Sequence, residues 1–262
     1  MILSAENGVM VDADLQSPKP PVAARPGLFG RELAVRAASA IVMLAVAGGA
    51  LWLGGWWWNG FVAVLACGVL WEWNRLVGKF GIAPLAEVAW LFGGVIYVVG
   101  AALYMADLRE RYVPLFMLVG FVLPIIAVDV GAYFAGRAIG GPKIAPAISP
   151  SKTWAGLFGG MAAVFLVACA IIFAFPESGH FGPPSEAGPQ LANFIASLIA
   201  AVFIAVIAQA GDFFESWMKR RAGVKDSSSL IPGHGGLFDR LDGFLAVFFM
   251  LFVVDAFGRL LG

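Results

Sequence analysis

A polar stretch near the C-terminus combines residue types that bind phosphate with residue types that bind divalent cations. Residues 211–244, GDFFESWMKRRAGVKDSSSLIPGHGGLFDRLDGF, hold five basic and five acidic residues between two strongly apolar segments. Magnesium is usually held by one or two carboxylates plus substrate phosphates, and Lys and Arg would neutralise the remaining phosphate charge. The stretch therefore predicts a metal-assisted phosphate reaction, with a structural network of salt bridges as the alternative.

The spacing within this stretch indicates how these groups would be presented. Its first part, folded as a helix, places four polar residues on one face at spacings of i, i+3, i+4 and i+7: Asp212, Glu215, Ser216 and Lys219. Glycines at positions 233, 235 and 236 surround His234, so that backbone amides can approach a phosphate closely. Asp239 and Asp242 are three residues apart and would share a face of the following helix.

A second polar segment, residues 129–156, has a related composition. Asp129 ends an apolar stretch, at a depth where an unpaired carboxylate is costly and is therefore a functional candidate. If the helix continues, Tyr133 and Arg137 lie on nearly the same face as Asp129. The next apolar stretch is preceded by three hydroxyl groups and a cation, from Ser149, Ser151, Thr153 and Lys152. The N–H groups at the start of the following helix would add to an anion site there. The alternative is a loop whose basic residues only obey the positive-inside rule.

Composition places both polar segments in a membrane protein. The 262 residues are 60% hydrophobic and 13% charged, with a mean hydropathy of +0.86, whereas soluble domains are about 25% charged. Stretches of about 20 mostly apolar residues can cross a bilayer, and they occur near 34–54, 56–74, 86–105, 112–130, 156–175, 191–211 and 243–258. We expect an all-α, polytopic integral membrane protein with about seven to nine transmembrane helices, whose cytoplasmic polar loops form the active site.

Two features of the chain divide and orient these helices. Gly54-Gly55 and the following WWWN predict a tight helical hairpin with tryptophans at an interface, or alternatively one long, bent helix. Basic residues are frequent in alternate short loops and absent from 176–190, so the positive-inside rule places both polar segments in the cytoplasm. Residues 1–30 are expected to be a disordered arm, 31–128 the N-terminal transmembrane helices, and 129–262 a catalytic transmembrane region.

Several function classes are excluded or unsupported. The chain contains no P-loop motif and no Gly-x-Ser-x-Gly elbow, so neither a P-loop ATPase nor that type of hydrolase is supported. Its formal net charge is zero and gives no indication of a nucleic-acid partner. Cys67 and Cys169 lie in apolar stretches far apart, without the spacing of metal ligands or of a disulfide framework.

The segment 216–242, SWMKRRAGVKDSSSLIPGHGGLFDRLD, resembles the signature of the phosphatidate cytidylyltransferase family, also called CDP-diacylglycerol synthases. The fixed positions of that signature are all filled: Ser216, Lys219, Arg220, Lys225, Asp226, Pro232, His234, Gly235, Gly236, Asp239, Arg240 and Asp242. The upstream segments DVGAYFAGR and ISPSKTWAG also resemble the family, which commonly has Glu where this chain has Ala155. A role for a carboxylate at that position is therefore absent or moved. The arm, residues 1–30, lies outside the resemblance.

The resemblance implies a reaction of phospholipid biosynthesis at the cytoplasmic face of a bacterial inner membrane. CTP and phosphatidic acid would give CDP-diacylglycerol and pyrophosphate with Mg²⁺, and whether a second cation such as K⁺ also binds stays open. The metal ligands would be Asp212 and Asp239, with Asp242 and Asp226 as secondary candidates. Residues expected to bind the two phosphate-bearing substrates or to shape their site are Lys219, Arg220, Lys225, Arg240, Ser216, His234, Gly235, Gly236, Ser149, Lys152, Thr153 and Asp129.

Two other functions remain as alternatives at this point. A CTP-dependent polyprenol or dolichol kinase would transfer the γ-phosphoryl group and release CDP instead of pyrophosphate. A transporter would carry polar residues at mid-membrane on several helices, whereas here they cluster at the cytoplasmic ends, with Glu72 and Glu87 as mild exceptions. The acyl-chain preference and the formation of a homodimer are left open by the sequence.

Overall fold

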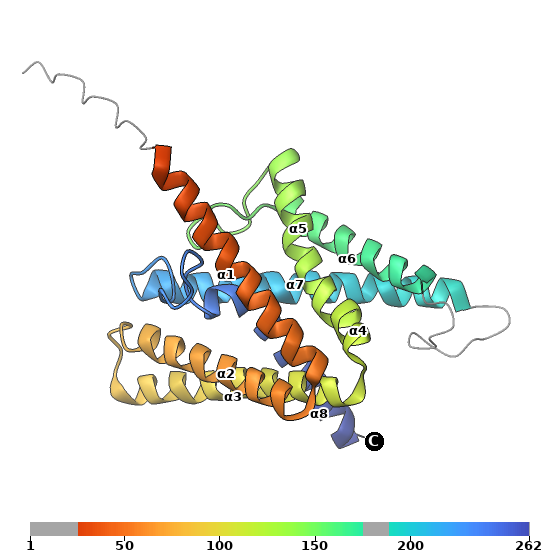
Figure 1. Cartoon of the computed structure of the whole chain (residues 1–262), viewed down its shortest axis with the longest axis horizontal. Helices are drawn as coiled ribbons and strands as arrows, with labels where there is room; N and C mark the ends of the chain where they lie inside the picture. Colours follow the sequence, from red (N-terminus) through yellow and green to blue (C-terminus); the bar gives the residue numbers. More distant parts are fainter. Residues whose placement is uncertain (1–25, 175–188, 262) are drawn as a thin grey trace, which may run out of the picture.

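The computed structural model describes residues 26–174 and 189–261, and this part of the chain is a bundle of long helices (Figure 1). Seven of its spans are long and apolar enough to cross a membrane, and no named strand occurs among the described residues. The helices are α1 (Pro26–Leu53), α2 (Gly55–Val77), α3 (Pro84–Arg111), α4 (Pro114–Met117), α5 (Leu123–Ala138), α6 (Trp154–Ala174), α7 (Pro189–Arg221) and α8 (Phe238–Leu261). The prediction of an all-α integral membrane protein is confirmed, and the expected arm, 1–30, lies mostly outside the described residues.

Three helices carry polar residues beyond the apolar stretches that were predicted to span the membrane. The span that begins with α4 continues through a π-helical turn, Leu118–Val122, into α5 and ends at Ala138 rather than near residue 130. Helix α7 runs on to Arg221, and α8 already begins at Phe238. Because these extra turns keep their backbone hydrogen bonds, the helices can present Arg137, Lys219 and Asp239 at one end of the bundle.

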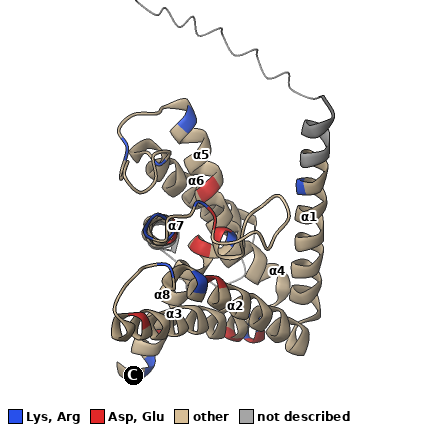
Figure 2. Cartoon of the chain, turned by 90° about the vertical axis from the view of Figure 1, so that its left-hand side faces the viewer, with Lys and Arg blue, Asp and Glu red and all other residues tan. Residues whose placement is uncertain are grey.

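The first two helices are separate, as predicted, but they do not form a tight hairpin. The chain breaks at Gly54 and Gly55, whose φ angles of 65° and 49° are readily adopted only by glycine. Helix α1 then runs away from α2 instead of lying along it (Figures 1 and 2). Arg109 of α3 stabilises this corner, since its Nε donates a hydrogen bond of 2.7 Å to the last turn of α1 at the Leu51 carbonyl.

Small residues allow the helices that carry the polar segments to pack closely. A side chain at Gly159 of α6 would collide with the Gly131 carbonyl and Ala135 of α5. Gly211 of α7 lies in the same way against the backbone of Asp242 on α8. In a membrane, close contact of this kind is a main source of helix association because lipid offers no hydrophobic driving force between helices. It sets Asp129 and Asp212, which lie next to these contacts, at neighbouring helix surfaces.

A cluster of aromatic side chains holds α2, α3, α7 and α8 together. Trp73 of α2 is almost fully buried, and its indole N–H donates a 3.0 Å hydrogen bond to the Trp90 carbonyl of α3. Its ring also contacts Phe214 of α7 and Phe238 of α8, at centroid distances of 5.7 and 5.8 Å. Each of three acidic residues is next in the sequence to a member of this cluster: Glu72 to Trp73, Glu215 to Phe214 and Asp239 to Phe238. Close packing of the aromatic rings therefore fixes the backbone positions of these carboxylates.

At the opposite end of the bundle, a half-exposed ion network joins α3 to α8. Arg111 pairs with Asp107 and lies 3.6 Å from Asp255, while Arg259 lies 2.7 Å from Asp255 and 3.6 Å from Asp107. Ion pairs with this degree of exposure contribute little to stability. The network is remote from both polar segments and supplies matched control positions for them.

Candidate active site

The two polar segments meet at one end of the helix bundle. The loop 139–153 and the loop 222–237 both lie at the end where α5 and α7 finish and where α6 and α8 begin. Lys152 forms an ion pair with Asp212, and Arg220 Nε lies 3.5 Å from the Ile148 carbonyl oxygen. Figure 2 looks onto this end and shows charged residues gathered among α5, α6, α7 and α8.

Three carboxylates on three helices form the first part of the site, which we call the acidic cluster: Asp129, Asp212 and Asp242. All three interact electrostatically with one another. Lys152 forms an ion pair with Asp212 and interacts electrostatically with Asp129 and Asp242. Asp212 also accepts a long hydrogen bond, 3.3 Å, from the Ser216 hydroxyl one turn further along α7. The acidic cluster thus combines three carboxylates with Lys152, which is ion-paired with Asp212, and with Arg240, which interacts electrostatically with Asp129.

A cleft of about 440 Å³ opens beside the acidic cluster between α5 and the loop that precedes α6. Asp129 and Lys152 line it, and the basic side chains of Arg137 and Lys143 lie at its wall. The Thr153 hydroxyl accepts a 3.0 Å hydrogen bond from the Gly156 N–H and caps α6, which begins one residue later. The hydroxyl groups and Lys152 thus directly precede the first turn of α6, and the cleft has the size and polarity of a small-ligand site.

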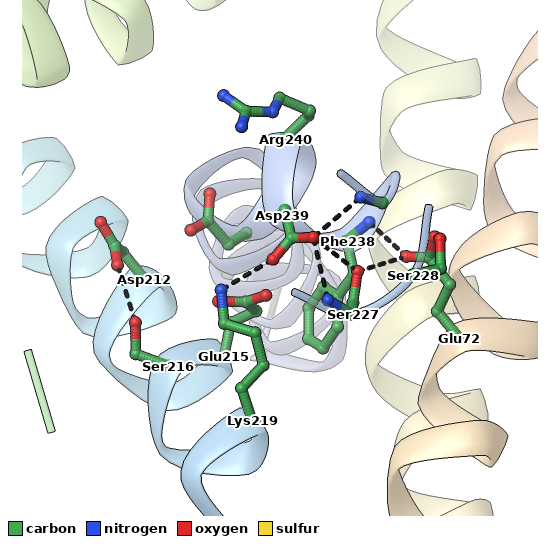
Figure 3. Close-up of polar contacts among 12 residues, drawn as sticks. Glu72, Asp212, Glu215, Ser216, Lys219, Ser227, Ser228, Phe238, Asp239 and Arg240 are labelled. Carbon is green, nitrogen blue, oxygen red and sulfur yellow. Dashed lines mark hydrogen bonds and ion pairs between the residues drawn. The ribbon is translucent and has the colours of Figure 1, made fainter. Parts of the chain in front are cut away.

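A second group of polar residues surrounds Asp239 at the start of α8 (Figure 3). Lys219 Nζ lies 2.7 Å from Asp239 Oδ1 and 2.6 Å from Glu215 Oε2, so one ammonium group pairs with two largely buried carboxylates. Asp239 Oδ2 accepts hydrogen bonds from the Ser227 and Gly236 backbone N–H groups, at 2.9 and 2.8 Å. Glu215 Oε1 has no hydrogen-bond partner among the described residues.

The same oxygen of Asp239 connects to Glu72 of α2. The Ser227 hydroxyl lies 2.9 Å from Asp239 Oδ2 and also 2.9 Å from Glu72 Oε2. Figure 3 shows Ser227 between the two carboxylates. We call this chain of contacts, from Glu72 through Ser227 and Asp239 to Lys219, the Glu72–Asp239 network.

The glycine-rich turn is shaped by close contacts as well as by backbone conformation. Gly235 has a φ of +84°, which disfavours other residues. A side chain at Gly236 would collide with the Ser227 hydroxyl and the Glu72 carboxylate. His234 Nδ1 lies 3.0 Å from the Ser39 hydroxyl of α1, which also lies 3.1 Å from the Pro232 carbonyl oxygen. The turn is therefore held by α1, α2 and α8 together.

The structure brings most of the predicted site residues together, but in two groups. Asp212 and Asp242 belong to the acidic cluster, whereas Asp239 belongs to the Glu72–Asp239 network. Lys225 and Asp226 are exposed in the loop 222–237, and no hydrogen bond or ion pair joins them to either group among the described residues. Three residues lie at the margin of the two groups. Ser149 is buried in its loop, whereas Arg220 and Arg240 are exposed. Arg240 Nε donates a 2.9 Å hydrogen bond to the His234 carbonyl.

Two contributors were not assigned a role from the sequence. Glu72 is fully buried and was treated as a mild exception near the end of an apolar stretch. The rule that a carboxylate within a membrane helix marks a functional position would have found it. Ser39 of α1 is an ordinary residue of an apolar helix, and no signal in the sequence marks its contact with His234.

An aromatic cleft of about 500 Å³ lies on the side of the bundle beside these groups. Its lining comes from α2, α3, α7 and α8: Trp73, Ala89, Trp90, Gly93, Tyr97, Phe214 and Phe249. Tyr97 interacts electrostatically with Asp242, so the apolar cleft adjoins the acidic cluster. This juxtaposition suits a ligand with a charged head and an apolar tail.

The donor atoms of the acidic cluster fit Mg²⁺. They are carboxylate oxygens, and Mg²⁺ binds through one or two of them while substrate phosphates and water complete its coordination. Within the described residues, no three His, Cys, Asp or Glu side chains converge as a ready-made cage. The arrangement therefore suits a metal that arrives with a phosphate ligand.

Comparison with known proteins points to one family. The model of the cytidylyltransferase family matches residues 83–257. A phosphatidate cytidylyltransferase of Brucella suis is 35% identical over 212 residues, which are 77% of this chain and 73% of the relative. The corresponding protein of Pseudomonas aeruginosa is 31% identical over 224 residues, 83% of this chain and 74% of the relative. One from Haemophilus influenzae is 38% identical over 167 residues, 62% of this chain and 54% of the relative.

Proposed function

Because the chain belongs to the cytidylyltransferase family, we propose that it transfers the cytidylyl group of CTP to phosphatidate, forming CDP-diacylglycerol and pyrophosphate. The observation that carries this proposal is the acidic cluster with Lys152, which lies between a polar cleft and an aromatic cleft. A nucleotide and a lipid could meet there. The protein is thus a nucleotidyltransferase of phospholipid biosynthesis.

The chemistry requires neutralisation of charge more than a protein nucleophile. A phosphate oxygen of phosphatidate attacks the α-phosphorus of CTP, and the bond from that phosphorus to the bridging oxygen breaks, so pyrophosphate leaves with the electron pair. Two unit charges about 4 Å apart repel by roughly 1 kcal/mol in water and about 4 kcal/mol at an effective dielectric of 20. Cations around the phosphates lower this repulsion and so lower the barrier.

The residues would divide this work between the two groups. Asp212 and Asp242 of the acidic cluster, with Asp239 beside Lys219, are the proposed Mg²⁺ ligands. Mg²⁺ would supply charge neutralisation at the triphosphate when bound. The cationic groups that would hold the triphosphate or the lipid phosphate are Lys152, Lys219, Arg220, Lys225 and Arg240. Asp129, at the wall of the polar cleft, would support the site through its electrostatic interaction with Lys152.

Removal of divalent cations is expected to abolish turnover. With EDTA in excess over all divalent cations, pyrophosphate release from CTP and phosphatidate should fall to background, because the acidic cluster would repel the triphosphate. Addition of Mg²⁺ beyond the chelator should restore the rate. Measuring pyrophosphate release during this titration tests the requirement. Full turnover in EDTA would contradict it.

The aromatic cleft is the proposed site of the lipid's acyl chains. A Cβ atom added at Gly93 would meet no atom within 4 Å, so Gly93→Leu should leave the fold intact and fill part of the cleft. The KM for phosphatidate should rise several-fold while the KM for CTP stays unchanged, since only the tail site is obstructed. Gly60→Leu on α2, where an added Cβ atom also meets no atom within 4 Å, is the matched control. Equal KM values for phosphatidate in both variants would contradict the assignment.

We further propose that this end of the bundle faces the cytoplasm of a bacterium and that the protein lies in its inner membrane. The support is the concentration of Lys and Arg in the segments 137–152 and 219–240 at this end, which follows the positive-inside rule. CTP would then reach the polar cleft from the side on which it is made.

The reaction itself is tested with the purified protein, CTP, Mg²⁺ and two lipids. With phosphatidate, we expect equal amounts of pyrophosphate and of a lipid that contains cytidine. With a polyprenol, which offers a hydroxyl group, we expect no release of CDP. Release of CDP with formation of a phosphorylated lipid would replace the proposed function with the kinase alternative.

A further inference from the structure

Glu72 of α2 is the most completely enclosed carboxylate near the site. Its side chain is fully buried, and each of its oxygens lies within hydrogen-bond distance of two donors. Oε1 accepts from the Ser228 hydroxyl at 2.5 Å and from the Leu237 N–H at 2.9 Å. Oε2 accepts from the Phe238 N–H at 2.6 Å and faces the Ser227 hydroxyl at 2.9 Å. A buried charge is tolerated when it is hydrogen-bonded as fully as this one.

Two of these donors belong to the beginning of α8. The first N–H groups of a helix have no partner within it, and the positive end of the helix dipole favours a carboxylate there. Glu72 supplies that carboxylate from another helix, 166 residues away in the sequence from Phe238. It therefore fixes where α8 begins, and Asp239 lies in the first turn of α8.

The other two donors extend this control to the loop. Ser228 and Ser227 follow Asp226, and Ser227 contacts Asp239 through both its N–H and its hydroxyl group. Asp239 in turn holds Lys219 at 2.7 Å. Gly236 passes so close to Glu72 that any side chain there would collide with its carboxylate. One carboxylate on α2 thus determines the positions of the loop, the start of α8 and the Asp239–Lys219 pair.

We propose that Glu72 is a positioning residue for the transfer reaction: its carboxylate acts through Ser227 to hold Asp239, and Asp239 in turn positions Lys219 for the substrate phosphates. This inference rests on the proposed function, since it concerns the rate of that reaction. Glu72 does not touch the polar cleft, and its role is to keep both oxygens of Asp239 in fixed directions. Outer partners of this kind typically change activity by about 10- to 100-fold.

The test compares Glu72→Gln, Ser227→Ala and the double variant with the wild type. Gln keeps the shape but turns an NH₂ group toward donors, and Ala removes only the bridging hydroxyl group. We expect kcat to fall by at least about 10-fold in each single variant, with unchanged KM values for CTP and phosphatidate. The double variant should be no slower than the slower single variant, because both changes interrupt one chain of contacts. Glu87→Gln, the same change at the start of the neighbouring α3, should keep the wild-type kcat.

Several outcomes would overturn the proposal. They are a wild-type kcat in Glu72→Gln, independent and multiplicative losses in the double variant, or a loss that disappears when kcat is expressed per folded protein. If Glu72→Gln does not fold, Ser227→Ala alone decides, because a wild-type kcat in that variant removes the connection between Glu72 and Asp239. Pyrophosphate release by the wild-type protein is measured in the same assay, so failure of the proposed function is recognised separately.

Discussion

Asp212→Asn is expected to lower kcat for pyrophosphate release by about 10²- to 10³-fold, while the protein still folds and inserts. Asp212 pairs with Lys152 and interacts electrostatically with Asp129 and Asp242. The Asn side chain keeps the shape but removes one negative charge, so the acidic cluster would hold Mg²⁺ and orient Lys152 less well. The measurement is kcat in mixed micelles, with thermal unfolding as the check on folding.

The matched control for this variant is Asp107→Asn. Asp107 is also a carboxylate paired with a basic residue, but it lies in the ion network at the opposite end of the bundle. Its replacement should leave kcat unchanged and lower stability only slightly, because its side chain is 39% exposed. If Asp212→Asn retained the kcat of this control, the acidic cluster would not be part of the catalytic site.

Lys219→Met is expected to affect both stability and turnover. Lys219 is the single ammonium group within hydrogen-bond distance of Glu215 and Asp239 among the described residues. Its loss leaves two largely buried carboxylates without a cation, and breaking such a pair costs about 3 kcal/mol or more. Turnover should fall by at least about 100-fold because a phosphate-neutralising charge is also lost.

The double variant Glu215→Gln/Lys219→Met separates these two effects. Removal of the Glu215 charge relieves the repulsion, and Asp239 keeps its hydrogen bonds from Ser227 and Gly236. We therefore expect the unfolding temperature to recover toward the wild-type value while kcat stays as low as in Lys219→Met. Recovery of kcat together with stability would assign Lys219 a purely structural role.

The amino-acid sequence predicts the membrane helices and the meeting of the two polar segments well. Apolar stretches of about 20 residues are typical of spanning helices, and the positive-inside rule predicts that the basic loops lie on one side. The continuation of α7 past the apolar stretch to Lys219 was predicted from local spacing and is confirmed. These features depend on residues that are close in the sequence.

Contacts between distant residues could not be predicted in this way. The hydrogen bond between Ser227 and Glu72 joins residues 155 positions apart, and nothing in the spacing of either segment indicates it. That Asp212 and Asp239 share a metal stays a prediction; the hydrogen bonds from the Ser227 and Gly236 N–H groups to Asp239 could not be foreseen from the spacing of the aspartates. The direction of α1 was also undetermined, because a helix that is apolar on all sides does not specify its neighbour.

The most direct test of the proposed reaction follows the fate of each phosphorus atom of CTP. The purified protein is incubated in vesicles that contain phosphatidate, with Mg²⁺ and CTP labelled at either the α- or the γ-phosphorus. The α-label should enter the lipid fraction together with cytidine, and the γ-label should appear only in pyrophosphate. Appearance of the γ-label in the lipid, with CDP in solution, would contradict cytidylyl transfer at this site.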